Sequence, residues 1–172
     1  LTIQEHLGVP RPRVTLAWAP HIKPLPKAVP NSFLLSSAAM GYDITVAHPQ
    51  GYELASSVIQ EAQRMSQQTG GRINFSHDLE SAVKDTQVIY AKAWGPSSPL
   101  APPQDSLTSW MTHERHLKLA DPKAIFIHCL PVRRNVEVHD SILDSPQCKV
   151  IDEAENRFHI QRALIHFLLS HS

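Results

Sequence analysis

The chain has 172 residues, of which 42% are hydrophobic and 19% charged, with 16 basic and 16 acidic side chains. This composition supports one folded domain of ordinary size and excludes a disordered, strongly charged chain. The balanced charge disfavours a general nucleic-acid binder, which would be strongly basic. No apolar run reaches the roughly 18–20 residues that cross a bilayer, and two cysteines are too few for a disulfide framework. We therefore expect a cytoplasmic protein with neither a nucleic-acid nor a membrane partner.

Short apolar segments alternate with segments of helical spacing along the whole chain. In chain order we expect a strand over 14–18, a helix over 27–40, a strand over 43–47, a helix over 56–69, a strand over 72–75, a helix over 78–83, a strand over 88–91, a loop over 93–106, a helix over 107–119, strands over 124–127 and 149–151, and a helix over 154–169. Gly41 and Gly70 stop the first two helices.

This alternation predicts a single α/β domain over residues 1–172, a doubly wound, mainly parallel sheet with helices on both faces. Ligands bind such sheets at the carboxyl ends of the strands. The segments expected at that edge are 19–26, 48–52, 92–95, 128–134 and 152–157. The apolar side of the last helix is expected to join the core, with an oligomer contact as the alternative, and it comprises Phe158, Ala163, Leu164, Phe167 and Leu168.

Two segments after predicted strands carry polar groups suited to a small ligand. His128-Cys129-Leu130-Pro131 follows one strand directly, and two arginines come next. The second segment, 152–157, opens the last helix. Its acidic residues suit the positive end of the helix dipole, whereas the positive charge of Arg157 does not. Arg157 is therefore a candidate for holding an anion or a carbonyl oxygen. Neither of the usual glycine-rich phosphate loops is present in the sequence.

The His-Cys-Leu-Pro segment followed by Glu-x-x-Asn-Arg resembles the carbamoyltransferase family, which transfers a carbamoyl group from carbamoyl phosphate to an amine. The resemblance implies that the backbone carbonyls of Cys129 and Leu130 bind the carbamoyl amide. It also implies that Arg157 contacts the carbamoyl oxygen, where negative charge develops during attack. The amine would attack carbamoyl phosphate directly, without a metal or an organic cofactor.

Segments 15–32, 48–54 and 90–94 resemble the subgroup that acts on N-acetyl- or N-succinylornithine. Ornithine enzymes carry Asp-x-x-x-Ser-Met-Gly after the corresponding strand, and their aspartate pairs with the α-ammonium. This chain has Lys92 there, which would repel an ammonium group and suit the α-carboxylate of an acylated substrate. The resemblance to the subgroup implies that Lys92 contacts the substrate and that Arg133 can do likewise.

Glu137 stands where some enzymes of the subgroup have a lysine that becomes carboxylated. One hypothesis is that the Glu137 carboxylate has a similar hydrogen-bonding role toward the acylated amine. The alternative is a solvated glutamate on a loop, since glutamate is commonly exposed. The sequence leaves both open.

Several further expectations rest on the resemblance alone. Family members are about twice as long and begin with a phosphate-binding domain that carries Ser-x-Arg-Thr and His-Pro-x-Gln segments, which this chain lacks. We therefore expect the amino-acid-binding half of an enzyme of arginine biosynthesis that forms a homotrimer, and no catalysis by this half alone. Its small-molecule partners would be carbamoyl phosphate and an acylated ornithine.

The alternatives are an ordinary ornithine carbamoyltransferase and a non-catalytic ligand-binding domain of the same fold. Lys92 weighs against the first, and the Cys129, Leu130 and Arg157 set against the second. His113 and His116 match no zinc-binding template by their spacing, so no metal ligands are expected.

Overall fold

The computed structural model describes residues 1–171 and contains one sheet. Its five strands are all parallel and lie in the order β3-β2-β1-β4-β5. They are β1 (Arg13–Trp18), β2 (Asp43–Ala47), β3 (Arg72–Ser76), β4 (Val88–Lys92) and β5 (Ile125–Ile127). The sequence-based prediction of a doubly wound α/β domain is confirmed.

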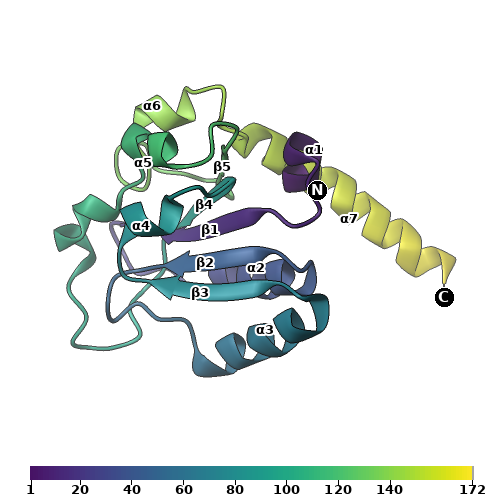
Figure 1. Cartoon of the computed structure of the whole chain (residues 1–172), viewed down its shortest axis with the longest axis horizontal. Helices are drawn as coiled ribbons and strands as arrows, with labels where there is room; N and C mark the ends of the chain where they lie inside the picture. The colour runs from purple at the N-terminus through teal and green to yellow at the C-terminus, as the bar shows by residue number, and fades with distance from the viewer. Residues whose placement is uncertain (172) are drawn as a thin grey trace.

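Helices connect the strands, and the two terminal helices lie beside each other on one side of the fold (Figure 1). They are α1 (Thr2–Leu7), α2 (Ala28–Ala39), α3 (Ser56–Thr69), α4 (Leu79–Val83), α5 (Glu114–Leu119), α6 (Asp140–Leu143) and α7 (Val150–Ser170), with short 3-10 turns η1 (Gln104–Ser106) and η2 (Thr108–Trp110). None of the helices described is long and apolar enough to cross a membrane.

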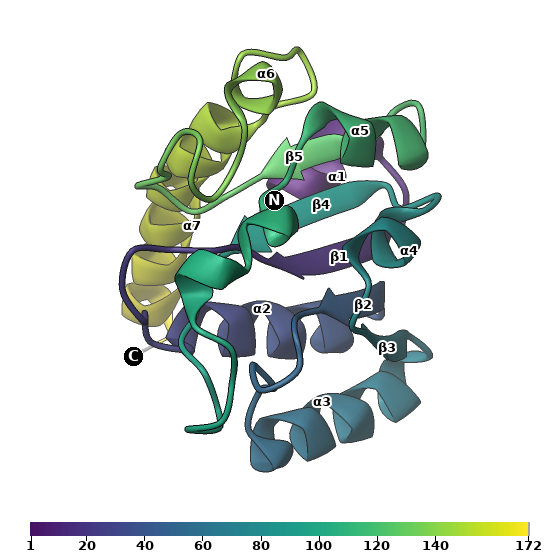
Figure 2. The same ribbon diagram turned by 90° about the vertical axis from the view of Figure 1, so that its left-hand side faces the viewer.

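The centre of the sheet forms the core because its strands are apolar along their whole length. In β1, every residue after Arg13 is buried, and β4 is buried up to its last residue, Lys92. Such continuous apolar strands are typical of a parallel sheet covered on both faces. Accordingly, α2 and α3 pack side by side, and α4 and α5 form a second packed pair (Figures 1 and 2).

The sixth predicted strand, over 149–151, is wrong. Only an isolated bridge joins Phe126 of β5 to Cys148, and α7 begins at Val150, with Glu153 N–H bonded to Lys149 C=O. Strand β5 has only three residues, so it offers little edge for a further partner. A short apolar run can equally begin a helix, and periodicity alone does not separate the two.

The predicted helix over 107–119 is divided. It comprises η2 and α5, joined by extended residues around Thr112. The Thr112 N–H donates to Glu137 C=O, and its own C=O accepts from His139 N–H. These bonds to the loop after β5 replace the bonds that a continuous helix would make.

The expectation that the apolar side of the last helix lies in the core is wrong. Val150 and Asn156 are buried at the start of α7, but every residue from 157 to 171 is exposed. The helix projects past the edge of the sheet (Figure 1). The five expected core side chains are therefore exposed, and they are Phe158, Ala163, Leu164, Phe167 and Leu168.

The first turn of α7 is held by α1, an element that the sequence patterns did not predict. The buried Asn156 amide donates to Thr2 Oγ1 at 2.9 Å and to Glu5. His6 Nε2 lies 2.7 Å from Asp152 Oδ2. Residue 156 is thus engaged in joining two helices, next to the exposed Arg157.

The turn after β2 packs tightly on the long loop after β4. Gly51 has a φ of +85°, and a Cβ atom there would lie 2.5 Å from Ala101 Cβ and 2.9 Å from Ala101 Cα. Its C=O also accepts from Ser97 N–H at 2.7 Å. Close backbone approach and left-handed geometry both require glycine at this position.

We predict that Gly51→Ala destabilises the fold by about 3 kcal/mol, because left-handed backbone strain adds to an overpacked contact. Gly8→Ala is the matched control: Gly8 has a φ of +62°, but a Cβ atom there would have no neighbour within 4 Å, so only the strain of about 1 kcal/mol applies. Urea unfolding of both variants measures the difference. Equal losses would show that the contact with Ala101 does not constrain the turn.

Candidate functional site

Several of the polar segments predicted to bind a ligand meet at the carboxyl edge of the sheet. Lys92 ends β4 and pairs with Trp18 at the end of β1, and His128 follows β5 directly. The next two residues are Cys129, which is half-buried, and Leu130, which is exposed and precedes a cis peptide bond to Pro131. Adjacent strand ends therefore bring together residues that lie far apart in the sequence.

Buried aromatic residues fix the chain on either side of Lys92. Trp18 Nε1 donates to Trp94 C=O at 2.8 Å, and Trp94 Nε1 donates to Tyr52 C=O at 2.7 Å. The rings of Trp18 and Tyr52 are 4.7 Å apart. Both indole donors are satisfied inside the fold, as buried tryptophan requires. The backbone that carries Lys92 is consequently rigid, while the side chain itself remains partly exposed.

Arg133 reaches across from the β5 loop to the loop after β1. Its Nε donates to His21 Nε2 at 3.1 Å, and His21 Nδ1 is 2.9 Å from Lys23 C=O. The histidine is therefore a neutral hydrogen-bond acceptor toward Arg133, and no carboxylate neutralises the guanidinium within the described residues. An unneutralised arginine of this kind suits a bound carboxylate.

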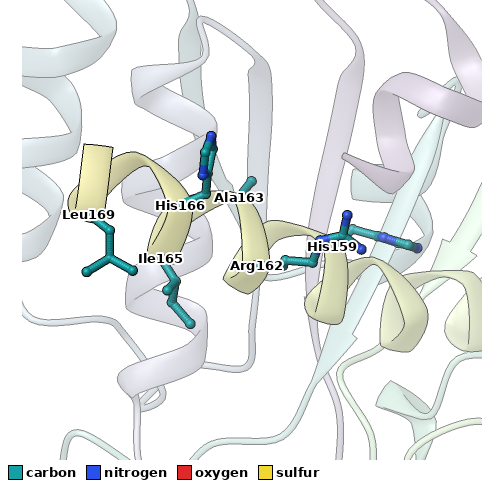
Figure 3. Close-up of a pocket in the computed structure, with 6 residues that line it drawn as sticks. All are labelled: His159, Arg162, Ala163, Ile165, His166 and Leu169. Carbon is teal, nitrogen blue, oxygen red and sulfur yellow. The ribbon is translucent and has the colours of Figure 1, made fainter. Parts of the chain in front are cut away.

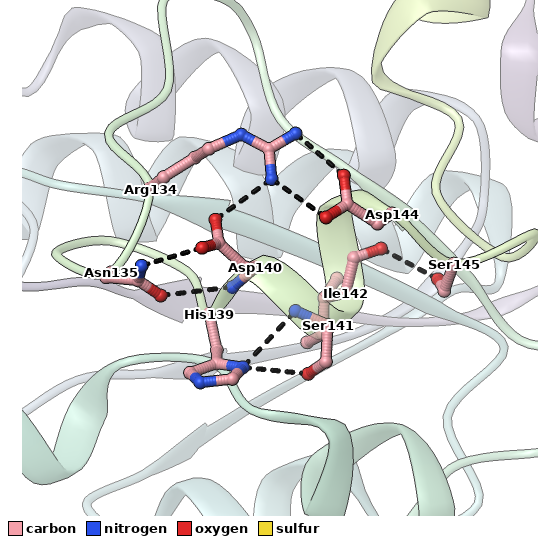
Figure 4. A network of polar contacts seen from close by, with 8 residues as sticks. All are labelled: Arg134, Asn135, His139, Asp140, Ser141, Ile142, Asp144 and Ser145. Atoms are coloured by element: carbon pink, nitrogen blue, oxygen red, sulfur yellow. Dashed lines mark hydrogen bonds and ion pairs between the residues drawn. The ribbon is translucent and has the colours of Figure 1, made fainter.

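The neighbouring Arg134 is a structural residue (Figure 4). It donates to Asp140 Oδ1 at 2.9 Å and to both carboxylate oxygens of Asp144 at 2.8 and 3.1 Å. Asn135, in a left-handed conformation with φ of 58°, donates to the other oxygen of Asp140. The hydrogen bonds that it donates to Asp144 and Asp140 raise the pKa of Arg134. The two adjacent arginines thus differ: one ties the loop to α6, and the other is available to a ligand.

Glu137 lies inside the fold. It is 1% exposed, so the alternative of a solvated loop glutamate is wrong. Its Oε2 accepts Arg133 N–H at 2.8 Å, and its Oε1 is 3.5 Å from Nε2 of the fully buried His128. Burial by itself would raise the pKa of Glu137, but His128, the Arg133 N–H and the charge of Lys92 outweigh it and lower the pKa.

Beneath the His128–Leu130 turn lie two residues to which the sequence analysis assigned no role. Tyr90, on β4, is 5% exposed and stacks on Phe33 with ring centroids 4.0 Å apart. Burial raises its pKa, and the neighbouring Glu153 and Cys129 add to the shift. Burial also raises the pKa of Glu153 to about 7, although hydrogen bonds with the His128 backbone and the Tyr90 side chain act to lower it. Both residues belong to segments that the sequence analysis named, Glu153 to Glu-x-x-Asn-Arg and Tyr90 to segment 90–94, but only the structure shows that they lie together beneath the turn.

Arg157 stands apart from this cluster in the described part of the chain. It is exposed on α7, and no hydrogen bond or ion pair holds it within residues 1–171. The structure therefore brings Lys92, Arg133 and Glu137 together with the Cys129–Leu130 turn, and it leaves Arg157 free at the edge.

Two hollows show where a ligand could and could not be held. A largely apolar pocket of about 240 Å³ adjoins His21 and Val136, beside Arg133. A wider, open hollow of about 850 Å³ lies along α7, far from the strand ends (Figure 3), and its lining residues are His159, Arg162, Ala163, Ile165, His166 and Leu169. It is a helix surface rather than a convergence of buried polar groups, so the carboxyl edge is the candidate site.

No group of three or more histidine, cysteine, aspartate or glutamate side chains within residues 1–171 could hold a metal ion. His113 and His116 instead form a capping box at the start of α5. The site thus consists of two cations, a buried carboxylate and a turn of backbone carbonyls. These features, at the ends of the parallel strands of an α/β domain, suit a small anionic ligand.

Residues 26–168 match the family described as aspartate/ornithine carbamoyltransferase, Asp/Orn binding domain. The chain belongs to this family. N-acetylornithine carbamoyltransferase of Xanthomonas campestris pv. campestris is 39% identical over 182 residues, covering 100% of this chain and 53% of the relative. N-succinylornithine carbamoyltransferase of Bacteroides thetaiotaomicron is 38% identical over 163 residues, covering 91% of this chain and 46% of the relative.

Solved structures agree with these sequence relatives. Acetylornithine transcarbamylase complexed with acetylcitrulline has a TM-score of 0.90 and 39% identity, covering 95% of this chain and 52% of that chain. A variant of N-acetyl-L-ornithine transcarbamylase complexed with carbamyl phosphate and N-succinyl-L-norvaline has a TM-score of 0.88 and 38% identity, with the same coverage. The chain spans about half the length of the curated relatives it matches.

The buried carboxylate makes a prediction about pH and stability. Because the pKa of Glu137 in the fold lies below its unfolded value of roughly 4.3, ionisation stabilises the fold above that pH. This contribution is lost as the pH falls through the folded pKa. We expect Glu137→Gln to lower the free energy of unfolding by about 1–3 kcal/mol at pH 7, and the loss to shrink below pH ~4.3.

Denaturant unfolding of the parent chain and the variant between pH 7 and pH 3 measures this loss. Gln can still accept the Arg133 N–H, so the variant tests charge rather than the hydrogen bond. A loss that stays constant over the whole pH range would contradict an ionised Glu137.

Proposed function

We propose that the full-length protein transfers the carbamoyl group of carbamoyl phosphate to the δ-amine of an N-acylated ornithine, either N-acetyl- or N-succinylornithine. The observation that carries this proposal is Lys92, a cation on a rigid backbone where a free α-ammonium would require an anion. Relatives named for both acylated substrates, at 38–39% identity, support it.

In the proposed reaction, Lys92 and Arg133 bind the substrate α-carboxylate. The buried Glu137 carries negative charge close to Lys92. In this proposal its carboxylate accepts a hydrogen bond from the acylated amine of the substrate. The lowered pKa of Glu137, which keeps it ionised, supports this role. A cation that is partly balanced by a buried carboxylate is held in a fixed orientation toward its ligand.

The carbonyls of Cys129 and Leu130 would accept the N–H groups of the carbamoyl amide, and Arg157 would contact the carbamoyl oxygen. The neutral δ-amine attacks the carbamoyl carbon and a new C–N bond forms. The C–O bond breaks with its electron pair on the departing inorganic phosphate, which accepts the proton lost by the nitrogen. Orientation and stabilisation of the charge on oxygen supply the catalysis. This scheme uses no metal or organic cofactor.

We further propose that this chain supplies the amino-acid-binding half and that the carbamoyl-phosphate-binding half lies elsewhere in the full-length protein. The length of the relatives, about twice that matched here, supports this division. On this account the 172-residue chain does not catalyse carbamoyl transfer by itself. Assembly as a homotrimer, a cytoplasmic location and a place in arginine biosynthesis are expectations from the family resemblance.

Substrate choice tests the role of Lys92. We predict that the full-length protein converts N-acetylornithine or N-succinylornithine and not ornithine, in assays of the three substrates side by side. Lys92→Gln is expected to raise KM for the acylated substrate about 10–100-fold, because one charge-assisted hydrogen bond is lost. Lys123→Gln, at an exposed position, is the control. Turnover of free ornithine alone would refute the proposed substrate class.

Arg157 is tested by separating kcat from stability. Its side chain is exposed and has no partner in residues 1–171, so Arg157→Gln leaves the free energy of unfolding unchanged. In the full-length protein we expect kcat to fall about 10²–10³-fold, as for loss of one donor to a developing oxyanion. Arg162→Gln, one to two turns further along the same exposed helix, is the matched control. Equal kcat values for both variants would remove Arg157 from the proposed site.

A further inference from the structure

A separate polar pocket lies at the end of β3, between α4 and α5. Its volume is about 270 Å³. It shares no lining residue with the pocket beside Arg133. The residues around it are His77, Asp78, Leu79, Glu80, Ser109, Trp110, Arg115 and His116. None of them belongs to the proposed carbamoyl-transfer site.

His116 supplies the most informative group of this pocket. Its side chain is 1% exposed, and its Nδ1 accepts His113 N–H at 3.0 Å. A neutral ring with Nδ1 as acceptor carries its proton on Nε2. Burial, with the charges of Arg115 and His113, lowers the pKa of His116 to about 4, so the ring is neutral at pH 7. Its Nε2–H is buried and has no acceptor within the described residues, which is a costly arrangement unless another molecule supplies one.

The remaining polar groups are divided by charge between the two helices. On the α5 side, Arg115 is a cation whose Nε lies 3.2 Å from Glu80 Oε1. On the α4 side, Asp78 uses Oδ1 to cap the helix, accepting from the N–H groups of residues 80 and 81. His77 Nδ1 donates to His48 C=O at 2.8 Å, so Nε2 is the ring nitrogen left for a ligand. Leu79 and Trp110 are the apolar part of the lining.

The distribution of charge around the pocket favours one class of ligand. A simple carboxylate would be attracted by Arg115 and His116 but repelled by Asp78 and Glu80. A simple amine would be attracted by Asp78 and Glu80 but repelled by Arg115. A molecule with both charges a few ångströms apart satisfies both sides. The pocket volume corresponds to on the order of nine waters, which is room for a small amino acid.

We propose that this pocket binds a free α-amino acid, with its carboxylate at His116 and Arg115 and its ammonium group at Asp78 and His77. The site is independent of the proposed substrate site, because the proposed substrate has its amine acylated and uses Lys92 and Arg133. An amino acid bound here would contact α4 and α5, which pack on one another beside the sheet.

The test is a titration of the ¹⁵N-labelled 172-residue chain at pH 7, followed by NMR. The probes are glycine, acetate and methylamine, and the signals are the His116 ring nitrogens and the Trp110 indole N–H. We expect glycine to shift both signals to saturation, and acetate and methylamine each to bind at least about tenfold more weakly, since each lacks one charge.

Two variants and one control keep the test decisive. Asp78→Asn retains an oxygen that can cap α4 but removes the charge, and His116→Gln retains an acceptor for His113 N–H; each should weaken glycine binding about tenfold, as judged by Trp110. Arg133→Gln, at the proposed substrate site, should leave glycine binding unchanged.

Three outcomes would overturn the proposal: no saturable shift with glycine, unchanged glycine affinity in both pocket variants, or loss of glycine binding in Arg133→Gln. The last outcome would assign the binding to the proposed substrate site instead. Because no step of this titration needs carbamoyl transfer, its failure would leave the proposed function untouched.

Discussion

The carboxyl edge of this domain depends on one buried anion, the carboxylate of Glu137. It accepts the Arg133 N–H at 2.8 Å and lies 3.5 Å from the fully buried His128, so it folds the loop after β5 back onto the end of that strand. Removing an ionised carboxylate from water is unfavourable, and only paired charges and hydrogen bonds offset it. Here His128, Arg133 and Lys92 together do so, because the pKa of Glu137 is lowered despite burial. This arrangement places the backbone of Arg133, and it brings Lys92 close enough to lower the pKa of Glu137.

The surroundings of Lys92 and Arg133 leave both cations able to bind a ligand instead of pairing with acidic side chains of the protein. The indole groups of Trp18 and Trp94 fix the backbone beside Lys92 through two buried hydrogen bonds. Arg134 binds the two aspartates of the α6 region, so its neighbour Arg133 keeps only a neutral histidine as partner. A site whose ligands are oriented by their neighbours needs little reorganisation on binding.

Much of the fold was predictable because apolar runs in parallel strands are long and continuous, as in β1 and β4. The failures lie where such runs are short: residues 149–151 begin a helix, since β5 has only three residues to pair with. The exposure of Phe158 and Leu164 could not be predicted either, because periodicity shows an apolar side of a helix but not what covers it. Lys92, Arg133 and the Cys129–Leu130 turn were identified from motifs, and the structure places them at one edge. The burial of Glu137 and the nearby Tyr90 and Glu153 required coordinates, since they depend on contacts between distant segments.

A crystal structure of the full-length protein with carbamoyl phosphate and N-acetyl-L-norvaline, which lacks the attacking amine, tests the central claim most directly. The account predicts the α-carboxylate within hydrogen-bonding distance of Lys92 and Arg133, with Glu137 still buried against His128. It also predicts the carbamoyl amide on the carbonyls of Cys129 and Leu130, with Arg157 at the carbamoyl oxygen. A carboxylate bound elsewhere, with Lys92 and Arg133 free of ligand, would contradict it.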